Sequence, residues 1–191
     1  MTLPRLLLLT DRKASCRPLL DVVAAAVEGG ARAVVLREKD LPIAERAALA
    51  ERLAAVLAPV GGRLVLAGGG IPAQAVHLAA DEAVPEPRPA QVGRSCHDAD
   101  ELGRARTEGC DWVTLSPVFA TESKPGYGPA LGLDGLRDLL ASAPPAYALG
   151  GVDAGNAHAC LDAGAHGVAV MGAVMRADDP AGCVAELLAA L

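Results

Sequence analysis

The chain of 191 residues is 52% hydrophobic but only 2% aromatic, carries 21% charged residues and has a formal net charge of −6; its length suits one domain, predicted to span residues 1–191. The acidic balance excludes a nucleic-acid partner, because no basic stripe is available to neutralise phosphates, whereas a small anionic ligand needs only a local cluster of cations. No apolar run reaches the roughly 20 residues of a membrane span, so no membrane partner is expected.

Strand-like and helix-like runs alternate along the whole chain. Continuous apolar runs are typical of strands covered on both faces, and the helical runs tend to end on glycine. The predicted strands are residues 5–11, 31–39, 63–67, 74–79, 90–96, 111–119, 146–151 and 167–172. The predicted helices are residues 17–30, 41–59, 98–109, 132–143 and 153–164, followed by a final helix that ends at Leu191.

The order of these runs predicts the α/β class, as a compact (β/α)₈ TIM barrel. A phrase made of a helix end, a glycine and an apolar strand recurs at residues 27–36, 106–115 and 161–170, which indicates repeated βα units. The barrel is expected to be shortened between its third and fifth strands, where the proline-rich residues 83–91 leave no room for a full fourth helix. The alternative is an open, doubly wound sheet.

In such a barrel the active site lies at the carboxyl ends of the strands. Arg37 and Lys39 end the second strand two residues apart, so they point to the same side and indicate an anion site. The alternative is an outward pair that forms surface ion pairs with Glu38 and Asp40. After the sixth strand, residues 116–129 form a long polar loop, which is the natural lid. Either three donors on this loop bind a second anion, or the loop is merely solvated; the three donors are Thr121, Ser123 and Lys124.

The last two strands both end in a glycine-containing turn before a helix. Backbone N–H groups in two such neighbouring turns predict one phosphate site, or else the glycines merely close the turns. The predicted phosphate-binding residues are Gly150, Gly151, Met171 and Gly172.

Four further residues complete the candidate site. Ser95 is expected to face the barrel mouth, whereas Cys96, its neighbour in the strand, points the other way. His77 is an acid–base candidate near a strand end, or else a core histidine bonded to backbone. Cys96 and His97 are kept as further titratable candidates, although a direct nucleophile–base pair of neighbours is disfavoured. The five scattered cysteines, without a CxxC motif, predict reduced thiols in a cytoplasmic protein.

Taken in order, the phrases TD after the first strand, LREKD, VGRSCH, SPVFATESKPGYGPALGLDGL, ALGGV and GVAVMGAV resemble the thiamine-phosphate synthase/TenI superfamily over nearly the whole chain. The synthase branch joins a pyrimidine diphosphate to a thiazole phosphate, with loss of pyrophosphate and help from Mg²⁺. The TenI-like branch tautomerises a thiazole carboxylate phosphate without metal. The resemblance places Arg37, Lys39, Ser95, Thr121, Ser123 and Lys124 on the diphosphate side and the four phosphate-binding residues on the thiazole side.

The chain departs from both branches. Synthases carry Asn-Asp-Arg after the third strand, whose Asp binds Mg²⁺, where this chain has Ala67, Gly68 and Gly69. They carry Gly-Gln-x-Asp after the fourth strand, where residues 79–82 leave only Glu82 as a substitute. The Gln that precedes Leu-Arg in the second strand is also absent. Pro117 stands where characterised tautomerases place a catalytic histidine.

Because Mg²⁺ needs oxygen ligands, these losses favour the TenI-like interpretation: a thiazole tautomerase-type isomerase with no metal or other cofactor. Its proton-transfer candidates are His77, Cys96 and His97. A thiamine-phosphate synthase that uses Mg²⁺, or a regulatory homologue that binds a phosphate ligand without turnover, are the alternatives. The expected partner is a small phosphorylated thiazole, with a homodimer left open.

Overall fold

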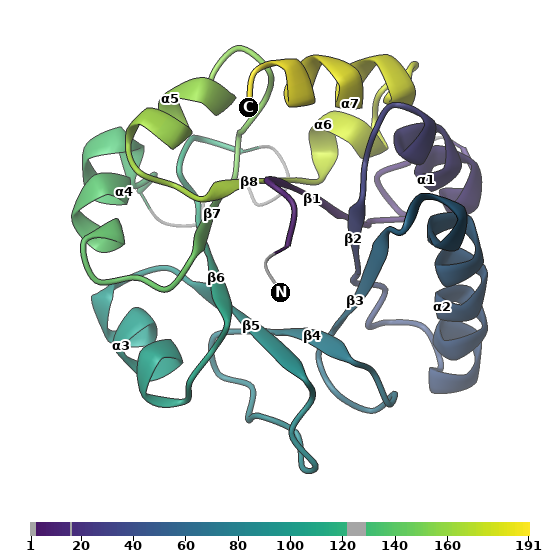
Figure 1. Ribbon diagram of the computed structural model, residues 1–191, viewed down its shortest axis with the longest axis horizontal. Helices are drawn as coiled ribbons and strands as arrows, with labels where there is room; N and C mark the ends of the chain where they lie inside the picture. Colours follow the sequence, from purple (N-terminus) through teal and green to yellow (C-terminus); the bar gives the residue numbers. More distant parts are fainter. Residues whose placement is uncertain (1–2, 16, 122–128) are drawn as a thin grey trace.

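A computed structural model describes residues 3–15, 17–121 and 129–191. Eight parallel strands pair in chain order, and the last pairs with the first, so the sheet closes into a barrel (Figure 1). This closure confirms the predicted (β/α)₈ barrel and excludes the open sheet. The strands are β1 Leu6–Leu9, β2 Ala33–Leu36, β3 Arg63–Ala67, β4 Ala75–Leu78, β5 Gln91–Cys96, β6 Trp112–Leu115, β7 Ala146–Leu149 and β8 Gly167–Val170.

Helices surround the barrel on most of its circumference (Figure 1). The run expected to form one final helix is split in two, because Asp179 caps a new helix that starts at Pro180. The helices are α1 Leu19–Glu28, α2 Ile43–Leu57, the 3-10 turn η1 Ala58–Val60, α3 Ala99–Thr107, α4 Gly132–Leu140, α5 Ala157–Asp162, α6 Gly172–Met175 and α7 Pro180–Ala189.

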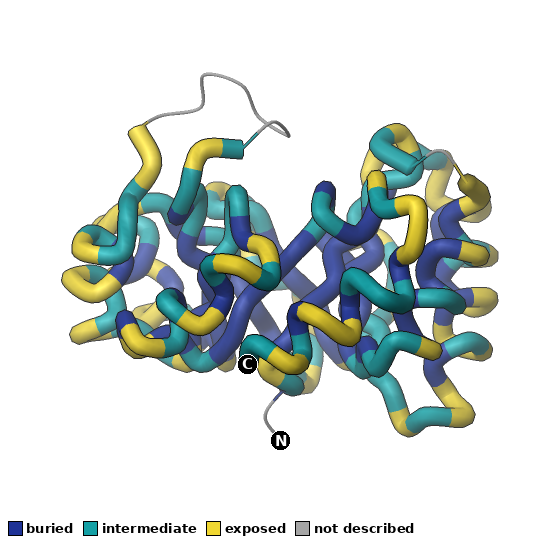
Figure 2. Tube along the Cα trace, turned by 90° about the horizontal axis from the view of Figure 1, so that it is seen from above, coloured by how far each residue is buried: buried dark blue, intermediate teal, exposed yellow. Residues whose placement is uncertain are grey.

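Alternation along the strands divides the core into two parts. Residues such as Leu8 and Val34 face the helices, whereas Leu7, Val35 and Val65 fill the barrel interior. Figure 2 shows buried residues concentrated along the central strands and exposed ones on the outer helices and loops. Small aliphatic side chains dominate the interior, which explains how a chain with 2% aromatic residues fills a barrel.

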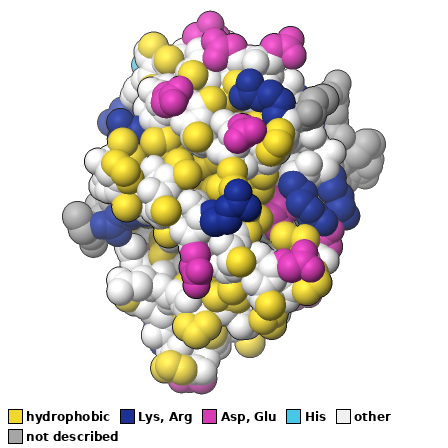
Figure 3. All heavy atoms as spheres, turned by 90° about the vertical axis from the view of Figure 1, so that its right-hand side faces the viewer, with side chains coloured by type: hydrophobic (Ala, Val, Ile, Leu, Met, Phe, Trp, Pro, Cys, Tyr) yellow, Lys and Arg dark blue, Asp and Glu magenta, His cyan; other side chains and the backbone are white. Residues whose placement is uncertain are grey.

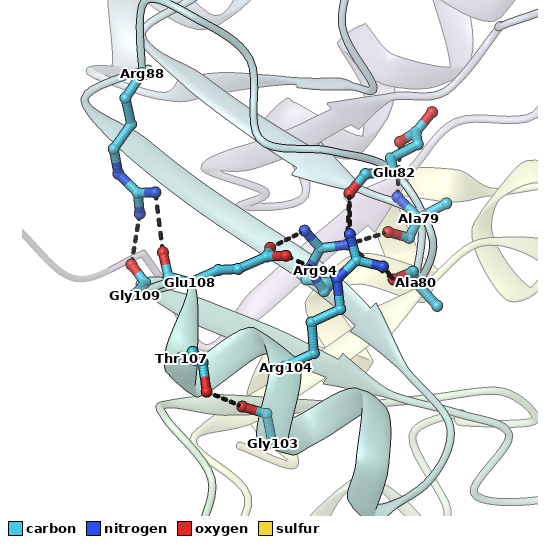
Figure 4. Close-up of polar contacts among 10 residues, drawn as sticks. All are labelled: Ala79, Ala80, Glu82, Arg88, Arg94, Gly103, Arg104, Thr107, Glu108 and Gly109. Atoms are coloured by element: carbon cyan, nitrogen blue, oxygen red, sulfur yellow. Dashed lines mark hydrogen bonds and ion pairs between the residues drawn. The ribbon is translucent and has the colours of Figure 1, made fainter.

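The barrel is shortened where the sequence predicts it. Between β3 and β5 the described residues form no helix, and only loops lie beside β4 in Figure 1. Arg94 of β5 fills part of this outer side. Its side chain is fully buried and donates to the carbonyl oxygens of Ala79, Ala80 and Glu82 at 2.8–2.9 Å, and it forms an ion pair with Glu108 (Figure 4).

A second arginine completes this cluster. Arg104 donates to Glu108 at 2.7 Å and to the Ala80 carbonyl at 3.1 Å (Figure 4). The loop after β4 is therefore tied to α3 by two guanidinium groups and one carboxylate. Carbonyl groups that a helix would otherwise have satisfied receive side-chain donors instead.

The outer face over α1 and α2 shows basic side chains in separate small groups, with acidic and hydrophobic side chains between them (Figure 3). Ile43, at the start of α2, is an exposed large hydrophobic side chain. In the part of the chain that the structure describes, no helix combines the length and apolar character needed to cross a membrane.

Candidate active site

A cavity of about 1020 Å³ opens at the carboxyl ends of the barrel strands. It draws lining residues from the ends of all eight strands, which the closed topology brings together from distant parts of the chain. Ser123 and Lys124 lie outside the described residues. The predicted site residues that line the cavity are Arg37, Lys39, His77, Ser95, His97, Thr121, Gly150, Gly151, Met171 and Gly172.

The segment after β2 supplies the two cations expected there. The backbone N–H of Arg37 donates to Thr10 Oγ1 at 3.0 Å, and its guanidinium contacts the Met171 sulfur across the barrel mouth. Arg37 thus lies beside the loop after β8. The side chains that neutralise Glu38 and Asp40 come from elsewhere.

Arg12, which was not among the predicted site residues, forms ion pairs with both of these carboxylates. It lies 2.9 Å from Glu38 and 2.7 Å from Asp40, and Lys13 adds a 2.8 Å contact to Asp40. Hydrogen bonds from Arg12 and Lys13 lower the pKa of Asp40 below its usual range. Glu38 and Asp40 therefore pair with Arg12 and Lys13. The alternative interpretation, in which they pair with Arg37 and Lys39, is wrong.

Lys39 pairs instead with Glu82, which follows β4. Lys39 Nζ lies 2.6 Å from Glu82 Oε1, and the Ala79 N–H donates to Oε2 at 2.8 Å. Burial would raise the pKa of Glu82, but the hydrogen bonds from Lys39 and Ala79 outweigh it and lower that pKa. The carboxylate is consequently charged and engaged at both oxygens.

His77 lies inside the barrel, 5% exposed, with its Nε2 3.1 Å from Ser95 Oγ and 3.3 Å from Thr114 Oγ1. Its ring stacks on Trp112 with 6.4 Å between centroids. Burial, followed by the charges of Lys39 and Arg37, lowers the pKa of His77 to about 4. The imidazole is therefore neutral near pH 7 and orients the Ser95 hydroxyl.

This neutral histidine makes the stability of the protein depend on pH. Its folded pKa of about 4 lies below the 6.5 of the free side chain, so between these values the unfolded chain binds more protons. The contribution is complete above pH 6.5 and is lost as the pH falls toward 4. At pH 4.5 this group alone should remove about 2–3 kcal/mol from the free energy of unfolding.

Urea unfolding of the wild type and of a His77→Gln variant at pH 7, 5.5 and 4.5 measures this effect. The variant cannot titrate, so its stability should fall less steeply over the same range. Equal slopes for the two proteins would contradict the shifted pKa.

The two other titratable candidates, Cys96 and His97, lie on different sides of the strand end, and only His97 lines the cavity. Cys96 points away from the cavity into the layer between strands and helices, is fully buried, and burial raises the pKa of its thiol to about 12. Cys96 is therefore not a site residue, because a buried neutral thiol cannot reach the ligand or transfer its proton. His97 does line the cavity, and its Nδ1 lies 2.8 Å from Glu101 Oε2.

The glycine turns after β7 and β8 both border the cavity. Gly150 and Gly151 have φ of 96° and 64°, and a Cβ on either would collide with residues 117–120 of the loop after β6. Within the described residues, neither the Gly151 N–H nor the Gly172 N–H donates a hydrogen bond. Both amides are thus available to an anion.

Arg176 is a cavity residue that the sequence analysis missed. Its guanidinium lies over Gly172, where a Cβ would collide with it. The glycine at this position therefore leaves space for the Arg176 guanidinium beside the turn after β8. The signal in the sequence was a basic residue one helical turn after Gly172, visible only once that turn is known to be helical.

The fold is a closed β/α barrel, and its mouth combines arginine and lysine side chains with two glycine amides that donate no hydrogen bond within the described residues, an arrangement suited to an anionic ligand. The chain belongs to the thiamine monophosphate synthase family, whose model matches residues 6–174. It is 42% identical over 199 residues to the thiamine-phosphate synthase of Albidiferax ferrireducens, covering 96% of this chain and 89% of the relative. A putative thiamine-phosphate synthase of Geobacter sulfurreducens is 37% identical, covering 97% and 93%.

A solved structure shows the same architecture. The thiamine phosphate pyrophosphorylase from Pyrococcus furiosus superimposes with a TM-score of 0.85 at 28% identity, covering 97% of this chain and 94% of that one. The interpretation of the chain as a TenI-type tautomerase was wrong, because relatives that are 31–42% identical over most of its length are named as synthases. Altered residues at a few ligand positions do not outweigh similarity over nearly the whole chain.

The synthase branch implies Mg²⁺, and the residues at the ends of β3 and β4 do not fit that ion. Gly68 offers no side-chain oxygen, and both oxygens of Glu82 are bonded to Lys39 and Ala79. Across the described ranges, no three His, Cys, Asp or Glu side chains gather as metal ligands. Mg²⁺ demands near-octahedral oxygen coordination, which this donor set does not supply.

Proposed function

We propose that this protein is a thiamine-phosphate synthase, which joins a pyrimidine diphosphate to a thiazole phosphate. The bond between the pyrimidine methylene carbon and the diphosphate oxygen breaks, and its electron pair leaves with pyrophosphate. The lone pair of the thiazole nitrogen then forms the new carbon–nitrogen bond, which gives thiamine phosphate. The observation that carries this proposal is one cavity with separate anion-binding groups on two sides.

The diphosphate side is assigned to the ends of β2 and β5 and to the loop after β6. Arg37 and Lys39 would hold the diphosphate oxygens, and Ser95, oriented by His77, would donate a hydrogen bond to it. Thr121 lies at the cavity, and Ser123 and Lys124, which lie outside the described residues, are assigned to the same side. Positive charge aimed at the departing group stabilises its developing charge.

The thiazole phosphate is assigned to the turns after β7 and β8. The amides of Gly150, Gly151 and Gly172 would cradle the phosphate, with Met171 beside the ring and Arg176 above the turn. Arg37 reaches Met171 from the opposite side, so its guanidinium lies between the two assigned anions. That position suits a group that holds both substrates in line for the transfer.

The test is incubation of the purified protein with both substrates, followed by chromatographic detection of thiamine phosphate and a pyrophosphate assay. Equal amounts of the two products are expected, since one forms for each of the other. Absence of thiamine phosphate with and without added Mg²⁺ would overturn the proposal. Binding of the thiazole phosphate without any product would instead favour a ligand-binding homologue.

The phosphate turn has its own test at Gly172. A carboxylate at this position would repel the phosphate and attract the Arg176 guanidinium, so Gly172→Asp should weaken binding of the thiazole phosphate by at least 30-fold. Gly151 is a poorer choice, because a side chain there would collide with the Ala120 carbonyl group and disturb the fold.

The matched control is Gly103→Asp, on the exposed side of α3, where a new Cβ meets no atom within 4 Å. It adds the same charge far from the cavity and should leave the affinity unchanged. Calorimetric titration measures both variants. An unaltered affinity in Gly172→Asp would refute the placement of the phosphate.

A further inference from the structure

We propose that this protein binds the diphosphate group with side-chain cations alone, and that the Lys39 ammonium, held against Gly68 by Glu82, does the work of a divalent metal ion. The inference rests on the proposed function only for the identity of the anion. It is carried by the arrangement of charges around the end of β3.

The first observation is that the space at Gly68 is already filled by a cation and its partner. A Cβ on this glycine would lie 3.0 Å from Glu82 Oε1, 3.0 Å from Lys39 Cε and 3.1 Å from Lys39 Nζ. The absence of a side chain at residue 68 is therefore what admits the ammonium group. Any carboxylate carried there would reach Lys39 directly.

The second observation is that Glu82 is built to hold this ammonium group. Its Oε1 accepts from Lys39 at 2.6 Å and its Oε2 accepts from the Ala79 N–H at 2.8 Å. The loop that carries Glu82 is fixed in turn by Arg94, which donates to the carbonyl groups of Ala79 and Glu82. The carboxylate thus positions one monovalent cation, and each of its two oxygens already accepts a hydrogen bond.

The third observation is a buried arginine directly behind this place. Arg46 of α2 is 5% exposed, donates to the carbonyl oxygen of Ala67, and has an Nε atom with no hydrogen-bond partner. Arg46 does not line the cavity, so it makes no direct contact with a ligand. Its positive charge acts on an anion in the cavity from behind the backbone of β3.

The local balance of charge is positive. Lys39 and Arg46 lie at the end of β3, and Arg37 adds a third positive charge from across the cavity beside Met171. Glu82 and its neighbour Asp81, which lines the cavity, supply two negative charges against them. Glu38 is neutralised separately by Arg12 at 2.9 Å. The remaining net positive charge attracts an anion, and fixed cations stabilise its charge without reorganisation.

Calorimetric titration with inorganic pyrophosphate tests the inference without requiring turnover. The wild type should bind pyrophosphate in EDTA at least as tightly as in Mg²⁺, since free Mg²⁺ only competes for the ligand. Lys39→Met keeps the length of the side chain and removes its charge, and it should weaken metal-free binding at least 10-fold.

Lys13→Met is the matched control, because Lys13 also borders the cavity but is largely exposed and bound to Asp40. It should change the affinity less than twofold. Gly68→Asp supplies the reverse test, since Asp tolerates the φ of 75° at this position better than most residues. It should weaken binding in EDTA at least 10-fold and make binding respond to Mg²⁺.

Pyrophosphate binding by the wild type that requires Mg²⁺, no binding under either condition, or equal losses in Lys39→Met and Lys13→Met would each overturn the inference. Thiamine phosphate formation that stops completely in EDTA would overturn it as well, while leaving the proposed function intact. Metal-free pyrophosphate binding without any thiamine phosphate formation would support the inference and overturn the proposed function.

Discussion

Arg94→Met is expected to lower the free energy of unfolding by about 3 kcal/mol, because the arginine is fully buried and four partners depend on it. The substitution keeps a similar volume but removes the shorter hydrogen bond to each of the carbonyl groups of Ala79, Ala80 and Glu82. Arg104 still donates to the carbonyl groups of Ala80 and Glu82, at 3.1 Å and 3.3 Å. It also removes one of the two cations that neutralise Glu108. Urea unfolding at pH 7 measures the loss.

Arg104→Met provides the control within the same cluster. Arg104 forms its ion pair with Glu108 at 2.7 Å, but 40% of its side chain is exposed. Exposed pairs of this kind contribute less than about 1 kcal/mol. If the two variants lost equal stability, burial of Arg94 would not be what makes the cluster important.

The consequence of Arg94→Met should extend into the cavity. The loop after β4 has no helix behind it, so its backbone depends on side-chain donors from β5 and α3 (Figure 4). Because Glu82 belongs to this loop, a loosened backbone would also release the contact with Lys39. Weaker pyrophosphate binding in Arg94→Met than in Arg104→Met is therefore expected alongside the loss of stability.

Arg37→Met is expected to lower kcat/KM for thiamine phosphate formation by about 10³-fold, while the free energy of unfolding stays within about 1 kcal/mol. Arg37 is fixed at its backbone by Thr10 and spans the cavity to Met171. Loss of its charge removes a group assigned to both substrates and to the departing pyrophosphate. Steady-state kinetics with each substrate varied in turn measures the effect.

Arg52→Met, on the exposed surface of α2, loses the same charge away from the cavity and serves as the control. Its kinetic constants should match those of the wild type. If Arg37→Met raised KM for the thiazole phosphate alone and left kcat unchanged, Arg37 would bind substrate without contributing to the departure of pyrophosphate.

The sequence alone determined the barrel and the direction of its strand residues. Both depend on short-range patterns: apolar runs that alternate with helical runs, and side chains that point to opposite faces at successive positions. These patterns placed Ser95 toward the cavity and Cys96 away from it, which is the arrangement in the structure. They also located the shortened region, since prolines in residues 83–91 oppose a helix.

Other features depended on contacts between residues far apart in the chain. Lys39 and Glu82 are 43 positions apart. Glu38 and Asp40, which the alternative interpretation paired with Arg37 and Lys39, form their ion pairs with Arg12 and Lys13 instead. Each partner choice follows from how β1, β2 and β4 converge at the barrel mouth. Patterns of residue types at neighbouring positions do not predict which side chains from distant elements meet after folding.

The end of β3 shows this division most clearly. From the sequence, Gly68 indicated only that a metal-binding carboxylate was missing, and this absence favoured the wrong branch of the family. The tertiary structure shows that Lys39, Glu82 and the buried Arg46 converge around that glycine. Sequence determined which side chain was absent, whereas only the closed barrel decided which charges occupy its place, because that depends on elements brought together by folding.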